Sequence, residues 1–326
     1  MNLPLSQANL VVRLSLILLR NILSGLFLLS LVIRFLIKDG IAEFAVVYYS
    51  TPLPILAIFS VMLGLMWWLS NDLRIAKLCF GITLGCLLVW SGQNISFNSR
   101  NPEADDIRLF FWNAASNKQA GEITGYIQNF DADIIGMVEA GIQKRRIGMW
   151  ENVFPEHVVQ RLPGNMALVT KGKILSKISG PLGKRGHYNL VKVDFTGKHF
   201  YVLLVDIDGD PLRSRAPAFQ QLTEMIHAYA QTNLIVMGDF NTPIDSVHFK
   251  SFRQNLTHAF ESGGFGFSPT WPVPLPVLTI DHIWVSKNIK VTSCNLNWSR
   301  FSDHRPVVAS IAPPDGALGE NCSRCL

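Results

Sequence analysis

The chain has 326 residues, 48% of them hydrophobic, and its mean hydropathy of +0.24 is high for a soluble enzyme. The formal net charge is +5. The segment up to Gly92 has six basic and three acidic residues, so the rest of the chain, with 23 basic and 21 acidic residues, has a net charge near +2. A strongly basic, nucleic-acid-binding face is therefore not evident in the C-terminal part.

Most of the apolar excess lies before Trp90, in three segments. Leu16 to Ile37 has the length of a bilayer span, which needs about 20 apolar residues. It contains Arg20 and Arg34, but its Leu, Ile, Val and Phe side chains favour insertion by several kcal/mol, which outweighs the cost of about 3 kcal/mol for a central arginine. A helix lying on the membrane surface is the alternative.

Phe44 to Leu69 is a clearer span, with two prolines that could bend its start, and Ile75 to Trp90 is a shorter third one. Arg74 lies between the second and third spans and Lys77 at the start of the third, and positive residues favour the cytoplasmic side. We therefore expect a multi-pass protein of the cell (inner) membrane, with an extracytoplasmic (periplasmic or external) C-terminal domain. The expected parts are an anchor with about three transmembrane helices (1–92), a polar linker (93–106), a catalytic domain (107–313) and a tail (314–326).

From residue 107 onward, apolar strands alternate with helical stretches, which is typical of an α/β domain. About 200 residues are enough for a sizeable core. The pattern predicts helices at Gly121–Asn129 and Ala216–Ala230. It predicts strands at Ile107–Asn113, Ile134–Val138, Asn165–Thr170, Leu190–Phe195, Phe200–Val205, Asn233–Met237, Ile280–Val285 and Val307–Ile311.

Polar side chains recur where these strands begin or end. Each one alone could be a turn or capping residue, but together they would gather carboxylates, amides and histidine along one edge of a sheet. Crowded carboxylates repel each other unless a cation neutralises them, and oxygen ligands suit Mg²⁺, Mn²⁺ or Ca²⁺. The sequence therefore predicts a divalent-metal site that acts on phosphate. Its candidate residues are Asn113, Glu139, Asp239, Asn241, Asp281, His282, Asp303 and His304.

Five motifs follow one another along the chain: WN (112–113), DIIGMVE (133–139), GDFNTP (238–243), IDHI (280–283) and SDHRPV (302–307). In this order they resemble the endonuclease/exonuclease/phosphatase superfamily, the deoxyribonuclease I-like group. The stretch FGFSPTWP, at 265–272, resembles bacterial members that are anchored by amino-terminal membrane helices. The resemblance implies a four-layer α/β sandwich, two packed β-sheets flanked by helices, and divalent-metal-dependent hydrolysis of phosphoesters.

The resemblance also implies a role for each matching residue. Glu139 would be the chief Mg²⁺ (or Mn²⁺) ligand, with Asn113 beside it, and Asp303 would complete the metal side. The catalytic residues would be Asp239, which orients or deprotonates the attacking water; Asn241, which holds that water or a phosphate oxygen; His304, which donates to the phosphoryl oxygen; and Asp281, which orients His304.

The sequence departs from the family pattern in one place. Asp206 stands where the family commonly has a histidine that binds phosphate and protonates the leaving group. An aspartate would repel phosphate unless it were protonated or metal-bound. Arg213 and Arg215 follow, and could supply part of the missing positive charge. The role of His282 stays open.

We therefore expect a membrane-anchored, metal-dependent phosphodiesterase, nuclease or phosphatase. The substrate class is open between nucleic acid, lipid headgroup and sugar phosphate, although the near-neutral domain argues mildly against nucleic acid. The alternative is a catalytically weakened module that binds a phosphorylated ligand or a protein, although no protein partner can be inferred. Cys322 and Cys325 form a lone C-x-x-C, for which a small disulfide or two free thiols are preferred to a zinc site.

Overall fold

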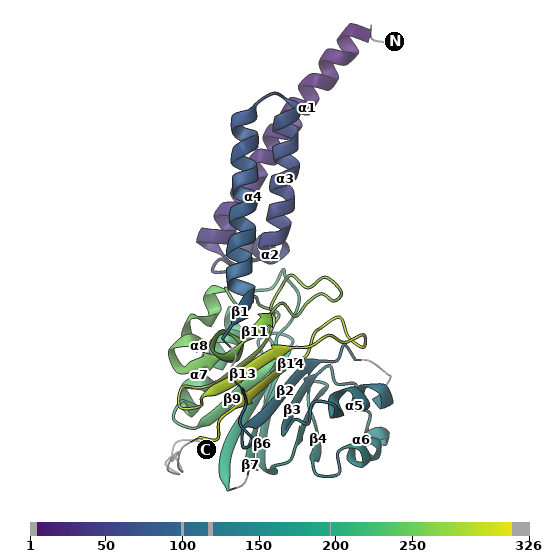
Figure 1. Cartoon of the computed structure of the whole chain (residues 1–326), viewed down its shortest axis with the longest axis vertical. Coiled ribbons are helices and arrows are strands. Elements are labelled where there is room, and N and C mark those ends of the chain that lie inside the picture. The colour runs from purple at the N-terminus through teal and green to yellow at the C-terminus, as the bar shows by residue number, and fades with distance from the viewer. Residues whose placement is uncertain (1–4, 99–100, 117–119, 196, 315–326) are drawn as a thin grey trace. The chain divides into compact units, whose positions relative to one another are not determined.

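The computed structural model describes residues 5–98, 101–116, 120–195 and 197–314 (Figure 1). The chain divides into two compact units, Met1–Gln93 and Asn94–Leu326. The C-terminal tail with Cys322 and Cys325 lies outside the described residues.

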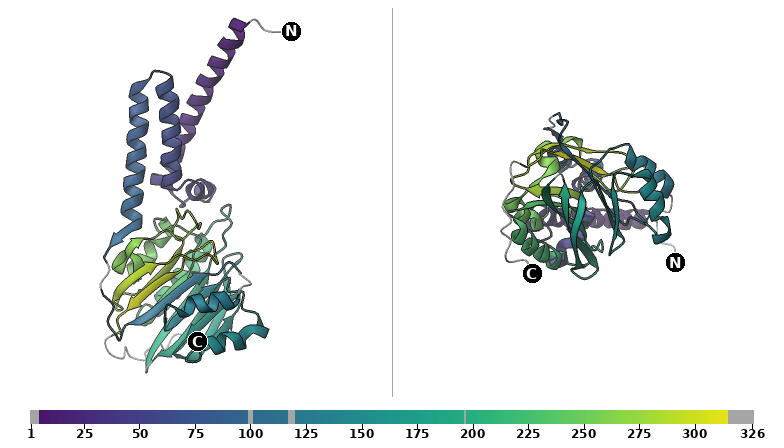
Figure 2. Two further views of the ribbon diagram at one scale, coloured as in Figure 1. Left: turned by 45° about the vertical axis from the view of Figure 1, so that its right-hand side comes forward. Right: turned by 90° about the horizontal axis from the view of Figure 1, so that it is seen from below.

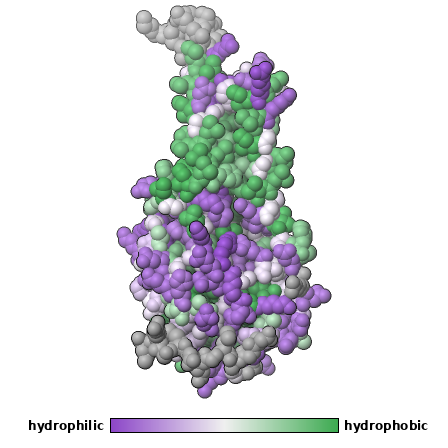
Figure 3. Space-filling model, turned by 90° about the vertical axis from the view of Figure 1, so that its left-hand side faces the viewer, coloured by the Kyte–Doolittle hydropathy of each residue, from purple (hydrophilic) through white to green (hydrophobic). Residues whose placement is uncertain are grey.

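The N-terminal unit is helical, and its surface is mostly hydrophobic (Figure 3). Among the described residues, two helical segments are long and apolar enough to cross a membrane: Val12–Ile37, and Leu73–Asn94, which is helix α4. The expected middle span is instead two helices bent by 73°, which count as one broken span or a re-entrant loop. The helices are α1 (Leu5–Val32), the π-helical turn η1 (Ile33–Ile37), α2 (Ala42–Ser50), α3 (Leu53–Leu69) and α4 (Leu73–Asn94).

Proline explains the break in the middle segment. Pro52 precedes α3 in an extended conformation, and Pro54 lies in the first turn of that helix, where a missing N–H is tolerated. The two arginines of the first segment pack on aromatic rings of the same unit. The guanidinium of Arg20 lies 3.4 Å from the ring centroid of Trp67, and that of Arg34 lies 4.4 Å from the ring of Tyr48. Cation–π contacts of this kind lower the cost of a cation among apolar helices.

The second unit contains two six-stranded mixed sheets. The first has the order β13-β14-β2-β3-β5-β4 and the second the order β10-β12-β9-β8-β7-β6. The strands of the first are β2 (Ile107–Asn113), β3 (Ile134–Val138), β4 (Val158–Leu162), β5 (Met166–Thr170), β13 (Val291–Leu296) and β14 (Val307–Ile311). Those of the second are β6 (Lys173–Leu182), β7 (Gly186–Phe195), β8 (Lys198–Asp206), β9 (Asn233–Asp239), β10 (Leu256–His258) and β12 (Asp281–Ser286).

The inner faces of the two sheets pack on each other and form the central core. Phe111 of the first sheet and Leu204 and Val285 of the second belong to this core and are fully buried. Gly136 of β3 marks a close approach of the sheets, because a Cβ atom there would lie 2.4 Å from side-chain atoms of Leu204 and Met237. A larger residue at position 136 would push the sheets apart.

Helices cover the outer faces, which completes the expected four layers (Figure 2). Phe110 and Trp112 point outward from β2 into a core that includes Ile123 of α5 and Trp150 of α6. On the other side, Trp284 of β12 packs with side chains of α7 and α8. These elements are α5 (Ala120–Gln128), η2 (Lys144–Arg146), α6 (Ile147–Val153), α7 (Ala216–Tyr229), η3 (Val247–Phe249), α8 (Lys250–Asn255) and α9 (Ala259–Gly263).

The eight predicted strands and two predicted helices are present, with bounds shifted by a few residues. Strands β4, β6 and β13 lie in segments for which no strand was predicted. The start of the expected linker is regular structure, because α4 continues to Asn94 and leads directly into β1 (Ile95–Phe97), which pairs with β11 (Phe265–Phe267).

Candidate active site

Three aspartates form a row across neighbouring strands of the second sheet. Asp206 and Asp239 end the parallel strands β8 and β9 and are register partners, and Asp281, which begins the antiparallel strand β12, is the partner of Asp239. Register partners project from the same face of a sheet. Because residues two positions away on each strand belong to the central core, this row faces the opposing sheet.

The first sheet contributes an amide and a fourth carboxylate. Asn113 ends β2 and Glu139 follows the parallel neighbour β3. The Nδ2 atom of Asn113 donates to Asp239 Oδ2 at 2.9 Å and to Glu139 Oε1 at 3.3 Å. Its Oδ1 accepts the backbone N–H of Ala115 at 2.9 Å, which fixes the amide orientation. Asn113 therefore links carboxylates of both sheets through its NH₂ group.

The backbone is strained at two of these positions. Glu139 has a φ of 45° and Asn241 a φ of 48°, both in the left-handed region that non-glycine residues seldom occupy. The backbone N–H of Asn241 donates to Asp239 Oδ1 at 2.8 Å, and its side-chain amide donates to the carbonyl of Ile207 at 2.8 Å. Strained backbone of this kind is concentrated at functional sites, where the surrounding structure holds it.

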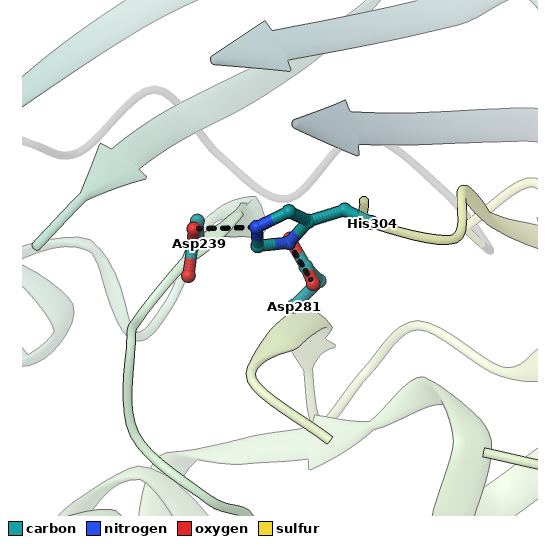
Figure 4. A group of neighbouring side chains, drawn as sticks. All are labelled: Asp239, Asp281 and His304. Atoms are coloured by element: carbon teal, nitrogen blue, oxygen red, sulfur yellow. Dashed lines mark hydrogen bonds and ion pairs between the residues drawn. The ribbon is translucent and has the colours of Figure 1, made fainter. Parts of the chain in front are cut away.

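His304 comes to the cluster on a loop between β13 and β14. Its Nδ1 lies 2.8 Å from Asp281 Oδ2 and its Nε2 lies 3.9 Å from Asp239 Oδ2 (Figure 4). The loop is held by Ser302, whose hydroxyl donates to the carbonyl of Asn113 at 2.7 Å and accepts the N–H of His304 at 3.0 Å. The geometry is that of a histidine oriented by one carboxylate and facing another.

Burial and charge set the protonation of the cluster. Burial alone would lower the pKa of His304, but the charge and hydrogen bond of Asp281, with the charge of Asp239, raise it above its usual value. Burial, and then the charge of Asp281, raises the pKa of Asp239. Burial, followed by the charges of Asp239 and Glu139, raises the pKa of Asp206 to about 8. At neutral pH the site thus holds an imidazolium and more carboxyl groups than it can keep ionised.

This donor set fits a hard divalent cation. The carboxylates of Asp239 and Asp281 each offer one oxygen, and these oxygens lie within 4.8 Å of each other and of a ring nitrogen of His304. Asp281 Oδ1 is buried without a hydrogen-bond partner in the described part of the chain. A bound cation would offset the carboxylate repulsion that adds to burial in raising the pKa of Asp206 and Asp239. Carboxylate oxygens are the ligands that Mg²⁺ and Mn²⁺ prefer.

Two other predicted residues have partners outside the cluster. Asp303 is exposed and accepts a hydrogen bond from Trp271 Nε1 at 3.0 Å. Arg213 is engaged by Asp208 at 2.8 Å and by Asp210 at 3.0 Å, so its charge is already paired.

The remaining arginine and His282 are buried. Arg215 donates towards the carbonyls of Arg213 and Gly209 at 3.4 Å. His282 lies on the opposite face of β12 from Asp281, where its Nε2 hydrogen-bonds the carbonyl of Thr242 at 3.0 Å and its Nδ1 contacts His258 at 3.2 Å. The structure therefore does not bring His282 to the site.

The sequence reasoning did not name several residues beside the site. Asn165 Nδ2 donates to Ser116 Oγ at 3.1 Å, and this hydroxyl lies 3.4 Å from Glu139 Oε2. His187 of β7 is the register partner of Asp206, and Trp271 lies with its ring 6.5 Å from that of His304. Trp271 had a signal in the FGFSPTWP stretch, and Asn165 begins a predicted strand. The position of His187 beside Asp206 depends on cross-strand register, which is not visible in one sequence.

The fold has many solved relatives of low identity, and three are representative. A Bacteroides thetaiotaomicron endonuclease/exonuclease/phosphatase family protein is 17% identical with a TM-score of 0.53, and covers 65% of this chain and 98% of its own. The human Nocturnin catalytic domain with bound sulfate is 19% identical with a TM-score of 0.52, and the match covers 68% of this chain and 97% of the Nocturnin chain. D. rerio TDP2 complexed with single strand DNA product is 12% identical with a TM-score of 0.53, and the match covers 64% of this chain and 99% of the TDP2 chain.

These identities show a shared fold and nothing finer. No curated protein matches the sequence significantly. The model of the Endonuclease/Exonuclease/phosphatase family matches residues 95–304, which include every residue of the cluster described above. The chain belongs to the endonuclease/exonuclease/phosphatase family.

Proposed function

We propose that the chain is a membrane-anchored hydrolase of phosphoester bonds that depends on Mg²⁺ or Mn²⁺. The observation that carries the proposal is the meeting of Glu139, Asp206, Asp239 and Asp281 with the Asp281–His304 pair at one edge of the two packed sheets. Membership of the family supports the same reaction class. In-line attack on phosphorus needs a cation, a positioned water and a donor for the phosphoryl oxygens, and this edge has groups for each.

A divalent cation, when bound, would supply charge neutralisation for the phosphate. Glu139 is the proposed chief ligand, and Asn113 holds the Glu139 and Asp239 carboxylates in place through its NH₂ group. Asp239 positions the attacking water and accepts its proton, and Asn241 keeps the Asp239 carboxylate oriented through a backbone N–H. His304 is cationic because of Asp281, and it donates to the oxygen where negative charge accumulates.

The metal and water roles are tested in the detergent-solubilised full chain. Glu139→Ala and Asp239→Asn should each remove most Mg²⁺-dependent hydrolysis of bis(p-nitrophenyl) phosphate, on the order of 10²-fold or more. Glu122→Ala is the matched control, because Glu122 is an exposed carboxylate that pairs with Arg300 at 3.3 Å on the surface. Near-normal turnover in either site variant, with unchanged thermal unfolding, would contradict the mechanism.

The membrane anchor and its orientation are part of the proposal. Two helices, or three if the bent pair is one span, are long and apolar enough to cross, and the positive residues Arg74 and Lys77 favour the cytoplasmic side. We propose that the bent pair is one span, so that three spans place the amino terminus inside and the hydrolase domain outside. Alkaline phosphatase fused after Asn101 should then be active. Activity of a cytoplasmic reporter at the same point would contradict this topology.

A second candidate function is a catalytically weak module that binds a phosphorylated ligand. Asp206 favours it, because an acid there replaces the family histidine that the reaction normally uses. Measured binding of inorganic phosphate or a phosphomonoester, with no metal-dependent turnover of any phosphoester, would favour this candidate. Turnover that Glu139→Ala abolishes would exclude it.

A further inference from the structure

A small two-stranded sheet at the start of the domain exposes a patch of large apolar side chains. Phe97 of β1 is 76% exposed, and its register partner Phe265 of β11 is 55% exposed. Their rings meet edge to face with centroids 5.9 Å apart, and Ile95 beside them is 41% exposed. Figure 1 shows β1 and β11 side by side. These rings are largely exposed and contribute little to the core of the domain, so an exposed apolar patch of this kind indicates an interaction surface.

The length of the chain confines this patch to the neighbourhood of a membrane. Helix α4 is a candidate span and ends at Asn94, and β1 begins at the next residue. Three extended residues reach at most about 10 Å. Each headgroup layer of a bilayer is about 5–8 Å thick, so Phe97 and its partner Phe265 lie at or close to the headgroup level if α4 spans. Aromatic side chains favour this layer.

The end of α4 is also tied to the catalytic edge. Asn94 is buried, and its Oδ1 accepts hydrogen bonds from Thr279 Oγ1 at 2.9 Å and from Ser268 Oγ at 3.2 Å. Thr279 lies two residues before Asp281. In the same segment, Thr270 Oγ1 accepts the backbone N–H of Asp281 at 3.3 Å. Asn94 is therefore hydrogen-bonded to segment 268–279, in which Thr270 also holds the backbone of Asp281.

We propose that the substrate is a phospholipid whose phosphodiester is taken from the bilayer surface, and that Phe97 and Phe265 seat the domain in that surface. This inference rests on the proposed function and names its substrate class. Water adds across one P–O ester bond: its oxygen goes to phosphorus, the bond to the leaving oxygen breaks, and that oxygen takes a proton. The products are a phosphate monoester and an alcohol. The near-neutral domain, which has no evident basic face for a nucleic acid, agrees with this choice.

The test uses the full chain in vesicles of phosphatidylethanolamine and phosphatidylglycerol with Mg²⁺ or Mn²⁺. Hydrolysis of the vesicle lipids is measured beside hydrolysis of soluble bis(p-nitrophenyl) phosphate. A Phe97→Ser/Phe265→Ser double variant should lose about tenfold on the vesicle lipids, since interfacial attachment scales with buried apolar area, and keep its rate on the soluble ester. Ile178→Ser is the matched control, because Ile178 of β6 is also 55% exposed.

A second readout does not depend on activity. A photoreactive p-benzoylphenylalanine in place of Phe265 should cross-link to the vesicle lipids, and the same group in place of Ile178 should not. Hydrolysis of the soluble ester without hydrolysis of either vesicle lipid would overturn the lipid proposal and leave the phosphoesterase function intact. Equal lipid hydrolysis by the double variant and the control, or equal cross-linking at both positions, would overturn the role of the two phenylalanines. Failure on the soluble ester would instead refute the proposed function.

Discussion

Replacing Asp206 by asparagine changes the stability of the domain in a direction that its environment determines. Burial, and then the charges of Asp239 and Glu139, raises the pKa of Asp206 from 3.8 to about 8. At pH 7 this carboxyl is protonated about ten times as often as it is ionised. Keeping it protonated where the unfolded chain would ionise it costs about 1.4 kcal/mol per pH unit above 3.8, or about 4 kcal/mol at pH 7.

Asparagine has the shape of the neutral carboxyl and does not titrate, so it avoids this cost. A pKa that is raised in the folded state means that stability falls as pH rises from 3.8 to about 8. Without divalent metal, Asp206→Asn should therefore raise the free energy of unfolding by up to about 4 kcal/mol at pH 7, and by only about 1.5 kcal/mol at pH 5. Asp208→Asn is the control, because it removes an ion pair with Arg213 and should bring no gain.

The assay is urea denaturation of the detergent-solubilised chain in EDTA, read by pulse proteolysis, which follows the domain even where the helices resist urea. With Mg²⁺ at pH 7 the asparagine variant should keep turnover within about threefold, since burial, the largest cause of the raised pKa, persists when a cation is bound. Equal stability of variant and wild type at both pH values would refute the reasoning, because Asp206 would then be ionised. A loss of turnover on the order of 10²-fold would identify it as a metal ligand instead.

Three further changes test other parts of the domain. Asp281→Asn should lower the pKa of His304 and reduce kcat by about 10²-fold, with a matching shift in the pH–rate profile; an unchanged profile would contradict the pairing. Burial lowers the pKa of His282 to about 4, so as pH falls the unfolded chain binds a proton at His282 before the folded domain does. The free energy of unfolding should therefore fall by up to about 3 kcal/mol between pH 6.5 and 4. The stability of His282→Gln should depend less steeply on pH, and an equal slope for variant and wild type would contradict the role of His282. Gly136→Val should lower the free energy of unfolding by about 1–3 kcal/mol, because its Cβ would lie 2.4 Å from two side chains of the facing sheet, while Gly121→Ala, with no neighbour within 4 Å, should not.

The resemblance of the five motifs to the family implied the four-layer fold. The main residues of the cluster were also visible in the sequence itself, as polar residues at the ends of apolar strands. What the sequence could not show is cross-strand register. The alignment of Asp206 with Asp239, and of Asp239 with Asp281, depends on strand pairing. The period-2 rule does predict that Asp281 and His282 face opposite sides, and it could have separated these two neighbours.

Other differences have local physical causes. Arg213 was expected to compensate for the missing positive charge at Asp206, but it forms ion pairs with Asp208 and Asp210. These two carboxylates lie within a few residues of Arg213 in the chain. Strand β6 was missed because it is an exposed strand rich in lysine and serine, which gives it no buried face to recognise. The two prolines were expected to bend the start of the Phe44–Leu69 span, and the bend of 73° divides it into two helices, an angle that hydropathy does not show.

Because the site is divided between two sheets, the appearance of activity reports when the two sheets dock during folding. Asp206, Asp239 and Asp281 belong to one sheet, whereas Asn113, Glu139 and the His304 loop belong to the other, and the Asn113–Asp239 hydrogen bond crosses between them. Each sheet alone carries half of the chemistry. During refolding, turnover should therefore appear only when the sheets dock, after most secondary structure has formed, and on gentle heating it should disappear before the sheets themselves melt.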